Sequence, residues 1–325
     1  MRAAVCRTYG LPEVVVVEEV DAPVPGPGEA LVETRAAAVN FPDVLIVADK
    51  YQLSVPVPFT PGSEIAGVVR TVGAGVDELA PGNPVFGAVM IGAFAEQVVV
   101  SAAALTRIPD GFDFGPAAAF GVAHTTAYHA LRSIAEVQAG EWVVVTGAAG
   151  GVGLAAVEIA QILGGRVIAL ASTKEKRDLC LQRGAEVVIA YHDEDVKARL
   201  REITGPGADV VLDQVGGPVA EQALRATRWG GRFVTVGYAS GEIPRIPLNL
   251  VLLKGVVVLG FEARSFAHHA PDLAARDRRE LFDLVETGRV DPYIGARFPL
   301  ANVADALQLV AAGDAMGKVV IDIPS

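Results

Sequence analysis

The stretch that decides the fold runs from Glu141 to Gly165 and reads EWVVVTGAAGGVGLAAVEIAQILGG. Its first part, Trp142 to Thr146, is an apolar run rich in β-branched residues, which predicts a buried strand. The apolar segment from Leu154 to Leu163 predicts a helix. A glycine-rich turn joins the two, so the order is strand, glycine turn, helix.

Three glycines, Gly147, Gly150 and Gly153, form this turn. A dinucleotide pyrophosphate requires such an arrangement, because glycines let the backbone approach the phosphates and the helix N-terminus offers unpaired N–H groups. The spacing is G-x-x-G-x-x-G rather than G-x-G-x-x-G, so an ordinary strand-to-helix turn remains an alternative. We expect the pyrophosphate to be bound by Gly147, Ala149, Gly150, Gly151, Val152 and Gly153.

The composition is that of a compact globular protein of about two domains, with 325 residues, 51% hydrophobic and 20% charged. The formal net charge of −11 argues against nucleic acid or an anionic membrane as the main partner. No apolar run approaches the ~20 residues that span a bilayer, and the N-terminus lacks the features of a signal peptide. Cys6 and Cys180 provide no disulfide framework. We therefore expect a cytoplasmic protein.

The chain changes its organisation near Phe120. Before this residue, short apolar or alternating segments are separated by Gly- and Pro-rich turns, which favours a sandwich or a partly open barrel. After it, strands alternate with helices, which predicts a parallel, doubly wound sheet. The strands expected before are Val14–Val20, Ala30–Val39, Ile65–Val72 and Phe94–Val100, and those after are Val143–Thr146, Arg166–Ala171, Glu186–Tyr191, Asp209–Asp213, Arg232–Gly237 and Val256–Phe261.

The pattern breaks again after Phe261. Two helical stretches, Asp272–Thr287 and Val303–Ala312, lead to a last strand, Lys318–Ile323. We expect this tail to return to the first domain. The predicted domains are residues 1–122 with 262–325, and residues 123–261 between them.

The end of the second strand of the doubly wound half indicates which dinucleotide is bound. NAD sites usually carry an Asp or Glu there, which bonds the ribose 2′-hydroxyl. Here the strand runs into Ser172-Thr-Lys-Glu-Lys-Arg177, with hydroxyl and basic side chains at its tip. Such donors bind a 2′-phosphate, whereas a carboxylate would repel it. Arg177 fits the solvated first turn of a helix better, but Ser172 and Lys176 predict NADP(H).

Several short motifs, in this order, resemble the medium-chain dehydrogenase/reductase superfamily and, within it, the zinc-free NADPH:quinone oxidoreductases of the ζ-crystallin-like group. The motifs are Asn40-Phe-Pro-Asp43, Lys50-Tyr51-Gln52, Pro58 to Gly67, Thr125-Thr-Ala-Tyr128, Ala148 to Gly153, Asp213-Gln-Val-Gly-Gly217 and Gly317-Lys-Val-Val320. The resemblance covers nearly the whole chain. It implies an α/β protein with a GroES-like β-barrel catalytic domain, a Rossmann domain, and often a dimer joined edge to edge through the Rossmann sheets.

No metal site is expected. Catalytic zinc needs three protein ligands from Cys, His and carboxylate. Zinc-dependent members of the superfamily carry a Cys where this chain has Asn40, and Gly-His-Glu where it has Gly62-Ser63-Glu64. The five histidines show no ligand spacing with a second ligand.

The resemblance places Asn40, Asp43 and Tyr51 on the substrate side of the cleft. Asn40 and Tyr51 are able to donate hydrogen bonds to a developing oxyanion, and Tyr51 to pass a proton. We expect Asp43 to orient Asn40 or the adjacent loop rather than to act as a base. Tyr51 as a loop aromatic without a chemical role remains an alternative. The family often has a Gly in the loop before Tyr51, where this chain has Asp49.

Further cofactor contacts are expected at the carboxyl ends of the strands, where a doubly wound sheet forms its ligand crevice. Val215, Gly237 and Tyr238 follow two of these strands. The resemblance adds Thr126 near the nicotinamide, Tyr191 near the adenosine ribose, and Phe261 and Lys318 as cofactor neighbours. Thr126 is expected early in a helix, where it would also suit an N-cap.

These expectations favour an NADPH-dependent reductase that transfers hydride to a quinone. An activated alkene (an enone, enal or enoyl thioester) is the alternative acceptor. The stretch from Asn40 to Ser63 contains Lys50 as its single basic residue, which suits a carrier-linked thioester less well. A non-enzymatic NADPH-binding protein is the alternative of another class.

Overall fold

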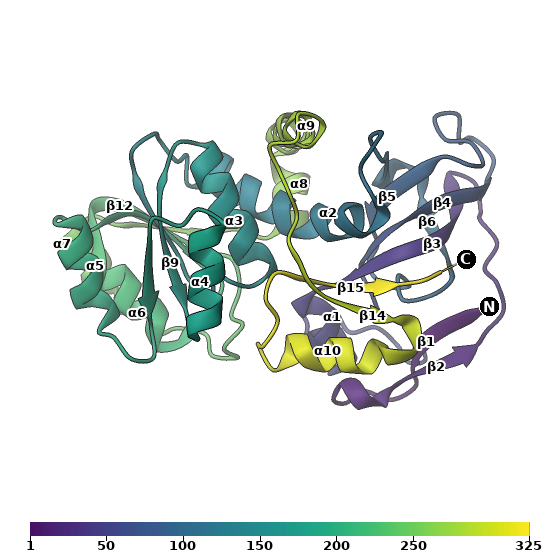
Figure 1. Cartoon of the computed structure of the whole chain (residues 1–325), viewed down its shortest axis with the longest axis horizontal. Helices are drawn as coiled ribbons and strands as arrows, with labels where there is room; N and C mark the ends of the chain where they lie inside the picture. The colour runs from purple at the N-terminus through teal and green to yellow at the C-terminus, as the bar shows by residue number, and fades with distance from the viewer. Residues whose placement is uncertain (325) are drawn as a thin grey trace. The chain divides into compact units, whose positions relative to one another are not determined.

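The computed structural model describes residues 1–324, which fold into two compact units (Figure 1). The first unit comprises Met1–Val122 and Pro292–Ser325, and the second comprises Ala123–Asp291. The chain thus leaves the first unit once and returns to it. The return lies later than the sequence suggested, since residues 262–291, expected in the first domain, group with the second.

A seven-stranded sheet forms the frame of the first unit. Its order is β14-β15-β3-β4-β5-β7, and β6 also pairs with β3. The strands are β3 (Glu29–Val39), β4 (Glu64–Val72), β5 (Pro84–Ala88), β6 (Gln97–Ser101), β7 (Leu105–Arg107), β14 (Ile294–Pro299) and β15 (Lys318–Asp322), and a separate antiparallel pair consists of β1 (Arg2–Cys6) and β2 (Val15–Glu19). The β-rich region expected before Phe120 is therefore present.

The last strand completes this sheet. β15 runs antiparallel to β3, with Val319 opposite Val39 and Val320 opposite Ala38. This register brings Lys318 beside the end of β3, although nearly the whole chain separates the two in sequence. The helical elements of this unit are η1 (Pro12–Val14), α1 (Phe41–Val47), η2 (Ala102–Ala104), η4 (Leu300–Asn302) and α10 (Val303–Ala311).

A six-stranded sheet forms the centre of the second unit, and its neighbouring strands are all parallel. The order is β10-β9-β8-β11-β12-β13, so the predicted doubly wound sheet is confirmed. The strands are β8 (Trp142–Val145), β9 (Arg166–Ala171), β10 (Val187–Ala190), β11 (Ala208–Asp213), β12 (Thr227–Thr235) and β13 (Val257–Gly260). The chain order reverses between β8 and β11, which is where ligands bind in such sheets.

Helices cover both faces of this sheet. Figure 1 shows α3 and α4 on one side and α5 and α6 on the other. The helices are α3 (Gly151–Ile162), α4 (Lys174–Gln182), α5 (Val196–Thr204), α6 (Gly217–Ala226) and α7 (Leu248–Lys254). The sheet is buried on both faces, in keeping with the continuous Val- and Ile-rich runs of its central strands.

A long helical segment precedes β8. α2 (Phe114–Tyr128) begins well before Thr126, which the sequence predicted early in a helix, and continues without a break into a π-helical turn, η3 (His129–Ile134). Two helices from the tail, α8 (Ala263–His269) and α9 (Pro271–Glu286), belong to the same unit as this turn.

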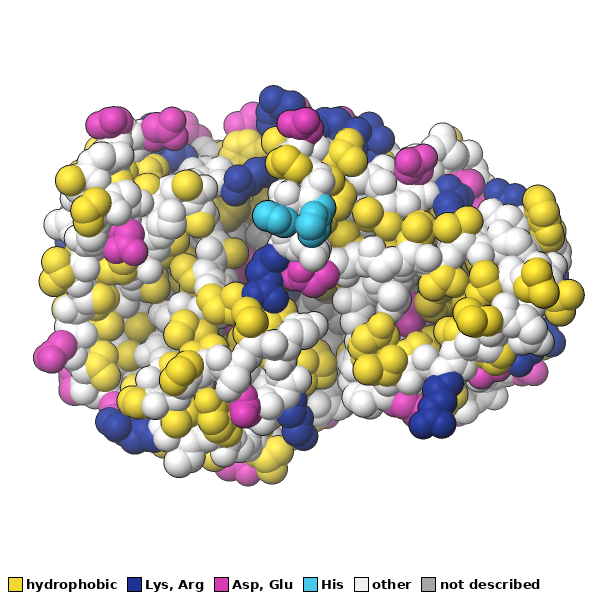
Figure 2. Space-filling view, turned by 180° about the vertical axis from the view of Figure 1, so that it is seen from behind, with side chains coloured by type: hydrophobic (Ala, Val, Ile, Leu, Met, Phe, Trp, Pro, Cys, Tyr) yellow, Lys and Arg dark blue, Asp and Glu magenta, His cyan; other side chains and the backbone are white. Residues whose placement is uncertain are grey.

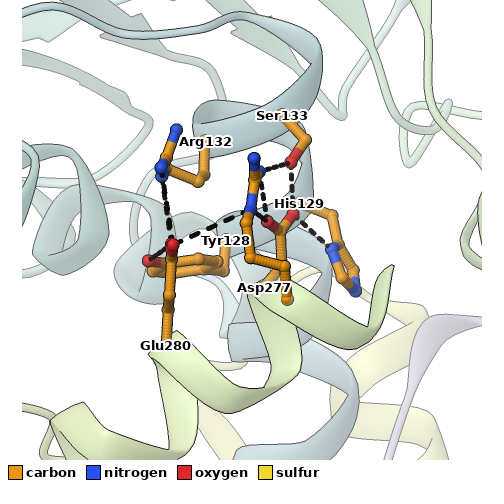
Figure 3. A network of polar contacts seen from close by, with 7 residues as sticks. Tyr128, His129, Arg132, Ser133, Asp277 and Glu280 are labelled. Carbon is orange, nitrogen blue, oxygen red and sulfur yellow. Dashed lines mark hydrogen bonds and ion pairs between the residues drawn. The ribbon is translucent and has the colours of Figure 1, made fainter. Parts of the chain in front are cut away.

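A buried carboxylate ties α9 to the π-helical turn (Figure 3). Asp277 is fully buried and pairs with His129 Nδ1 at 2.8 Å, while Ser133 Oγ donates to the same carboxylate oxygen. Arg276 Nη2 donates to Asp277 Oδ1 at 2.6 Å. Since His129 and Ser133 belong to the second unit, these contacts link α9 to it, in keeping with the grouping of residues 262–291.

A second carboxylate on the same helix extends the network. Glu280 Oε2 accepts the Tyr128 hydroxyl at 2.8 Å and Arg132 Nε at 3.1 Å. Burial lowers the pKa of His129, although the hydrogen bond to Asp277 opposes the shift. The imidazole also packs against the rings of Phe266, at 4.8 Å between centroids, and Phe261, at 6.0 Å.

Candidate functional site

The carboxyl edge of the parallel sheet gathers most of the predicted cofactor residues. Because all six strands run the same way, their carboxyl ends lie at one edge. Each predicted position comes within three residues after a strand. In chain order these positions are Gly147 after β8, Ser172 after β9, Tyr191 after β10, Val215 after β11, Gly237 and Tyr238 after β12, and Phe261 after β13.

The glycine turn connects β8 to α3. Gly150 is the residue before the helix, and its carbonyl accepts the first helical hydrogen bond, from Leu154 N–H at 2.9 Å. The N–H groups of Gly151, Val152 and Gly153 precede this bond, so they have no partner within the helix. Ala149 is buried beneath the turn. The helix N-terminus therefore presents donors and a positive dipole end.

The three glycines serve different purposes. Gly147 has φ 58°, a backbone conformation that favours glycine, and a Cβ there would lie 2.8 Å from Val215 Cγ2. A Cβ on Gly153 would lie 2.3 Å from the carbonyl oxygen of Gly147. Gly150 has an ordinary φ of −78°, and its Cβ would meet no atom closer than 3.5 Å. Packing thus demands Gly147 and Gly153, whereas a Cβ on Gly150 would make only an ordinary van der Waals contact. A glycine that packing does not demand, at the residue before the helix, fits close approach of a phosphate to the helix N-terminus.

A polar network joins the ends of β8 and β11, the strands at which the chain order reverses. Thr146 Oγ1 donates to Asp213 Oδ1 at 2.7 Å, and Gln214 Nε2 donates to the Thr146 carbonyl at 2.9 Å. Burial raises the pKa of Asp213, and its hydrogen bonds, including that from Gly216 N–H, oppose the shift. This network fixes the loop that carries Val215 against the glycine turn.

The loop after β12 lies against the loop after β11. Ala239 N–H donates to the Gln214 carbonyl, and Ser240 N–H to the Val215 carbonyl, both at 3.0 Å. A Cβ on Gly216 would lie 3.0 Å from the Tyr238 ring. The structure therefore brings Val215 and Tyr238 together, and Tyr238 is exposed.

Ser172 and Lys176 lie at the tip of β9, as the sequence suggested, and both are half-buried. Thr173 caps α4, with its hydroxyl accepting Lys176 N–H at 3.3 Å. Arg177 Nη1 donates to the Ser172 carbonyl at 2.8 Å, which is a local contact within the first turn. Tyr191 follows the neighbouring strand, is half-buried, and has its ring beside that of His192.

Thr126 and Phe261 occupy different settings from those expected. Thr126 lies near the C-terminal end of α2, not early in a helix, so an N-cap role is wrong. The reason is that the helix begins at Phe114, well before the Thr125 motif. Phe261 is 7% exposed and contacts Phe266 at 5.6 Å between centroids, which places its ring within the aromatic cluster around His129.

The first unit holds a second group of polar side chains, around Asn40. Lys318 is 4% exposed, and its Nζ lies 2.6 Å from Asn40 Oδ1 and 3.0 Å from Glu64 Oε2. Asn40 Nδ2 donates to the same Glu64 oxygen at 3.1 Å. Glu64, which was not among the predicted site residues, therefore lies at the centre of this group. Lys318 was expected near the cofactor, but its ammonium bonds to Asn40 and Glu64 within the first unit.

Glu64 also reaches α2. Its Oε1 accepts the Val122 N–H at 2.6 Å, and its side chain is 1% exposed. A Cβ on Gly121 would lie 2.9 Å from this oxygen, so the glycine makes room for the carboxylate. Two signals in the sequence point to this contact: an acid directly before the buried run Ile65–Val69, and a glycine inside a helix.

Asp43 holds the start of α1. Its Oδ2 accepts the Asn40 N–H at 2.7 Å, a contact through which it would orient Asn40. Burial raises the pKa of Asp43 to about 7, while the hydrogen bonds from Asn40 and Ser63 and the charge of Lys318 oppose the shift. The carboxyl group therefore titrates near neutral pH, unlike an exposed aspartate.

Tyr51 follows α1 in a short loop. It is half-buried and packs against the core of the first unit. The loop turns at Asp49, whose φ is 52°. Asp tolerates this left-handed conformation better than most residues. A conformation that favours glycine explains why the family often has a Gly in this loop.

No three His, Cys, Asp or Glu side chains within residues 1–324 are grouped so that they would hold a metal ion. None of the helices in the same range combines the length and apolar character that a membrane crossing requires. On the face seen in Figure 2, the basic side chains of the described residues are mixed with acidic ones.

Both units are similar to known protein families. A family model described as "Alcohol dehydrogenase GroES-like domain" matches residues 26–110, and one described as "Zinc-binding dehydrogenase" matches residues 151–276. The chain is 37% identical to a quinone oxidoreductase-like protein 2 homolog of Nematostella vectensis, over 99% of this chain and 88% of that protein. It is 31% identical to the human quinone oxidoreductase, over 99% and 97%.

Solved structures are similar over the same extent. An Escherichia coli quinone oxidoreductase complexed with NADPH has a TM-score of 0.92 at 28% identity, covering 99% of this chain and all of the other. A mycobacterial protein complexed with NADPH also has a TM-score of 0.92, at 31% identity and 99% coverage of both chains. The expected GroES-like and Rossmann organisation is confirmed.

The raised pKa of Asp43 predicts an unusual pH dependence of stability. An unfolded Asp titrates near ~3.9, but the folded Asp43 keeps its proton to about pH 7. Between these values the unfolded chain binds fewer protons, so the free energy of unfolding contributed by this group falls as pH rises. Asp43→Asn removes the titration and keeps an oxygen for the Asn40 N–H. We expect the variant to gain stability over wild type from about pH 4 to about pH 7, measured by urea unfolding at several pH values. If the free energies of unfolding of wild type and variant differ by the same amount at every pH, the prediction is contradicted.

Proposed function

Because the chain belongs to the quinone oxidoreductase family of the medium-chain dehydrogenases/reductases, we propose that it is an NADPH-dependent, zinc-independent oxidoreductase that transfers hydride to a quinone. The observation that carries the proposal is the glycine turn at the carboxyl edge of the parallel sheet. There, Gly150 precedes α3 at a position where packing does not demand a glycine, and the free N–H groups of the helix N-terminus suit a pyrophosphate.

The second unit supplies the residues that would hold the cofactor. The N–H groups of the first turn of α3 bind the pyrophosphate, and Ser172 with Lys176 at the tip of β9 bind the 2′-phosphate. Tyr191, Val215, Gly237 and Tyr238 line the same edge, with Thr126 and Phe261 as further neighbours. When bound, the dihydronicotinamide supplies the hydride.

The first unit supplies the residues that would hold the acceptor. Asn40 and Tyr51 carry polar groups that would orient a quinone, and Asp43 keeps Asn40 in place through its backbone. One quinone, one NADPH and one proton give one hydroquinone and one NADP⁺. The hydroquinone anion is stabilised enough to take its proton late or from solvent, so this reaction demands orientation and hydrogen bonding more than a strong acid.

Zinc independence rests on the residues at the positions where zinc-dependent relatives have ligands. Asn40 and Ser63 stand there, and Asn40 Nδ2 donates to the Ser63 hydroxyl at 3.3 Å and to Glu64 at 3.1 Å. Asn40 thus presents N–H donors, not a metal-ligating atom, toward Ser63 and Glu64. An amide nitrogen that donates hydrogen bonds to these oxygens is not available to bind a metal ion.

The proposed activity is tested by following NADPH consumption against a panel of ortho- and para-quinones, enones and enoyl thioesters. We expect quinones to be reduced fastest, NADPH to be used faster than NADH at equal low concentration, and activity to survive chelator treatment. Ser172 and Lys176 give the physical reason for the cofactor preference.

Three outcomes would count against this assignment. Faster use of NADH contradicts the 2′-phosphate site. Preference for enones, together with a strong loss of turnover in Tyr51→Phe, favours alkene reduction, because an enolate must be protonated. Binding of NADPH without turnover of any acceptor favours a non-enzymatic NADPH-binding protein.

The glycine turn predicts contrasting effects of two matched substitutions. Gly150→Ala adds a methyl group where no protein atom lies closer than 3.5 Å, whereas Gly153→Ala places it 2.3 Å from a carbonyl oxygen. We expect Gly150→Ala to keep the melting temperature of wild type but to weaken NADPH binding about 10-fold or more, since the methyl group occupies the phosphate space. Gly153→Ala should lower both the melting temperature and the affinity for NADPH. Unchanged NADPH affinity in Gly150→Ala, measured by fluorescence titration, would place the pyrophosphate elsewhere.

We further propose that the protein is a homodimer joined through the edge of the second unit's sheet. β13 is an edge strand, and Val257 and Val258 on it are 48% and 44% exposed. Leu252 of α7 is 80% exposed and Trp229 is 75% exposed. Figure 2 shows hydrophobic side chains at the end of this unit that carries α7. An exposed, apolar edge strand is a template for pairing with a second copy.

The dimer is tested by a matched pair of double variants. Leu252→Glu/Val257→Glu places charges on the proposed interface, whereas Leu11→Glu/Val24→Glu places them on exposed positions of the first unit. We expect light scattering to give a dimer for wild type and the second variant, and a monomer for the first. A monomeric wild type at micromolar concentration would refute the proposal.

A further inference from the structure

Lys318 carries a buried positive charge in the first unit. Its Nζ lies within reach of three oxygens, Asn40 Oδ1 at 2.6 Å, Glu64 Oε2 at 3.0 Å and the Val39 carbonyl at 3.5 Å. The residue is the first of β15, and the antiparallel register with β3 holds it there. Buried lysines are rare unless they are paired. This one is paired with Glu64.

The two charges determine which way the Asn40 carboxamide points. An ammonium only donates hydrogen bonds, so the Asn40 atom that faces Lys318 is the oxygen. A carboxylate only accepts them, so the atom that faces Glu64 is the nitrogen. A carboxamide turned by 180° would set its NH₂ against the ammonium and its oxygen against the carboxylate. Lys318 and Glu64 together therefore permit one orientation.

This orientation leaves one amide hydrogen loosely held. Nδ2 carries two hydrogens, and Glu64 Oε2 takes one of them at 3.1 Å. The other is left with Ser63 Oγ at 3.3 Å and the Ala38 carbonyl at 3.4 Å, which are longer contacts. Asn40 is 8% exposed, and Ser63 is half-buried. A substrate oxygen competes best for this second hydrogen. In the turned amide, the same side would present a carbonyl oxygen, which repels negative charge.

We propose that Lys318 is a positioning residue for acceptor reduction: its ammonium holds Asn40 so that an N–H, and not a carbonyl oxygen, faces the acceptor oxygen on which negative charge develops. The inference rests on the proposed function, since it takes Asn40 to be on the acceptor side. It also assigns Lys318 a different task from that of a cofactor neighbour.

Two variants separate positioning from simple charge balance. Lys318→Met removes the ammonium and leaves Glu64 as an uncompensated buried charge, which destabilises the fold. Lys318→Met/Glu64→Gln removes both charges, and a glutamine amide is able to bond Asn40 in either orientation. Lys197→Met, at an exposed position of α5, is the matched control.

We expect Lys318→Met to lower both the melting temperature and kcat. In the double variant the melting temperature should return to near the wild-type value, while kcat stays about 10- to 100-fold lower, as for the loss of an oriented donor. The Kd for NADPH, measured without acceptor, should change less than about 2-fold in every variant, as expected for a residue that does not touch the cofactor. Lys197→Met should match wild type throughout.

Two results would overturn the proposal. If the double variant recovers kcat together with its melting temperature, Lys318 serves charge balance alone. If NADPH affinity falls and kcat at saturating NADPH is kept, Lys318 is a cofactor neighbour.

A measurement without turnover keeps the inference separable from the proposed function. The side-chain amide signals of Asn40 in the ligand-free, ¹⁵N-labelled protein are assigned by comparison with Asn40→Ser. We expect them to move in both Lys318 variants and not in Lys197→Met. Unchanged signals would show that Lys318 does not hold Asn40, whatever the activity. If the signals move but wild type reduces no acceptor, the proposed function fails and the hold on Asn40 stands.

Discussion

The first unit depends on one buried carboxylate, that of Glu64. Its two oxygens accept hydrogen bonds from three segments that lie far apart in the sequence: the Asn40 amide, the Lys318 ammonium and the Val122 N–H. Taking a carboxylate out of water costs several kcal/mol, and a single ion pair repays this only when further hydrogen bonds satisfy the remaining lone pairs. Glu64 meets this condition, and in doing so it joins β4, β15, the start of α1 and α2.

The Glu64 carboxylate also explains why α2 contains Gly121, although glycine is unfavourable inside a helix. Glycine inside a helix costs about 1 kcal/mol relative to alanine. Gly121 lies within α2, and a Cβ there would come within 2.9 Å of Glu64 Oε1. A side chain would push the carboxylate away from the Val122 N–H and, with it, from Lys318 and Asn40. Gly121 therefore lowers the local stability of α2 but permits the hydrogen bond between Glu64 and the Val122 N–H, on which several segments depend.

Local pattern was sufficient to predict the parallel sheet of the second unit and its glycine turn. The parallel sheet follows from alternating apolar runs and helices, and Gly147 and Gly153 follow from a turn that leaves no room for side chains. Ser172 and Tyr191 could be placed at the sheet edge because each directly follows a strand. Each of these features depends on residues that are close together in the sequence. The sequence alone was therefore sufficient to predict them.

Features that depend on distant contacts could not be predicted in the same way. The grouping of residues 262–291 with the second unit follows from the pairing of Asp277 with His129, which are 148 positions apart. The position of Lys318 follows from the register of β15 on β3, not from its neighbours in sequence. The short helix α1 was not predicted, although Pro42 in its first turn and Asp43 as its third residue are start signals. Its seven residues are too few for a helical period to stand out in the sequence.

A buried ammonium acts on the acceptor differently from a metal ion. A metal ion binds a substrate oxygen directly and polarises it as a Lewis acid. The Lys318 ammonium already lies against Asn40 and Glu64 and is 4% exposed, so under the proposed function its charge acts on the acceptor only through the Asn40 amide. One oriented N–H stabilises a developing oxyanion less than a metal does. The arrangement therefore suits acceptors that already accept hydride readily and form stabilised anions, as quinones do, better than simple carbonyl compounds that need strong polarisation.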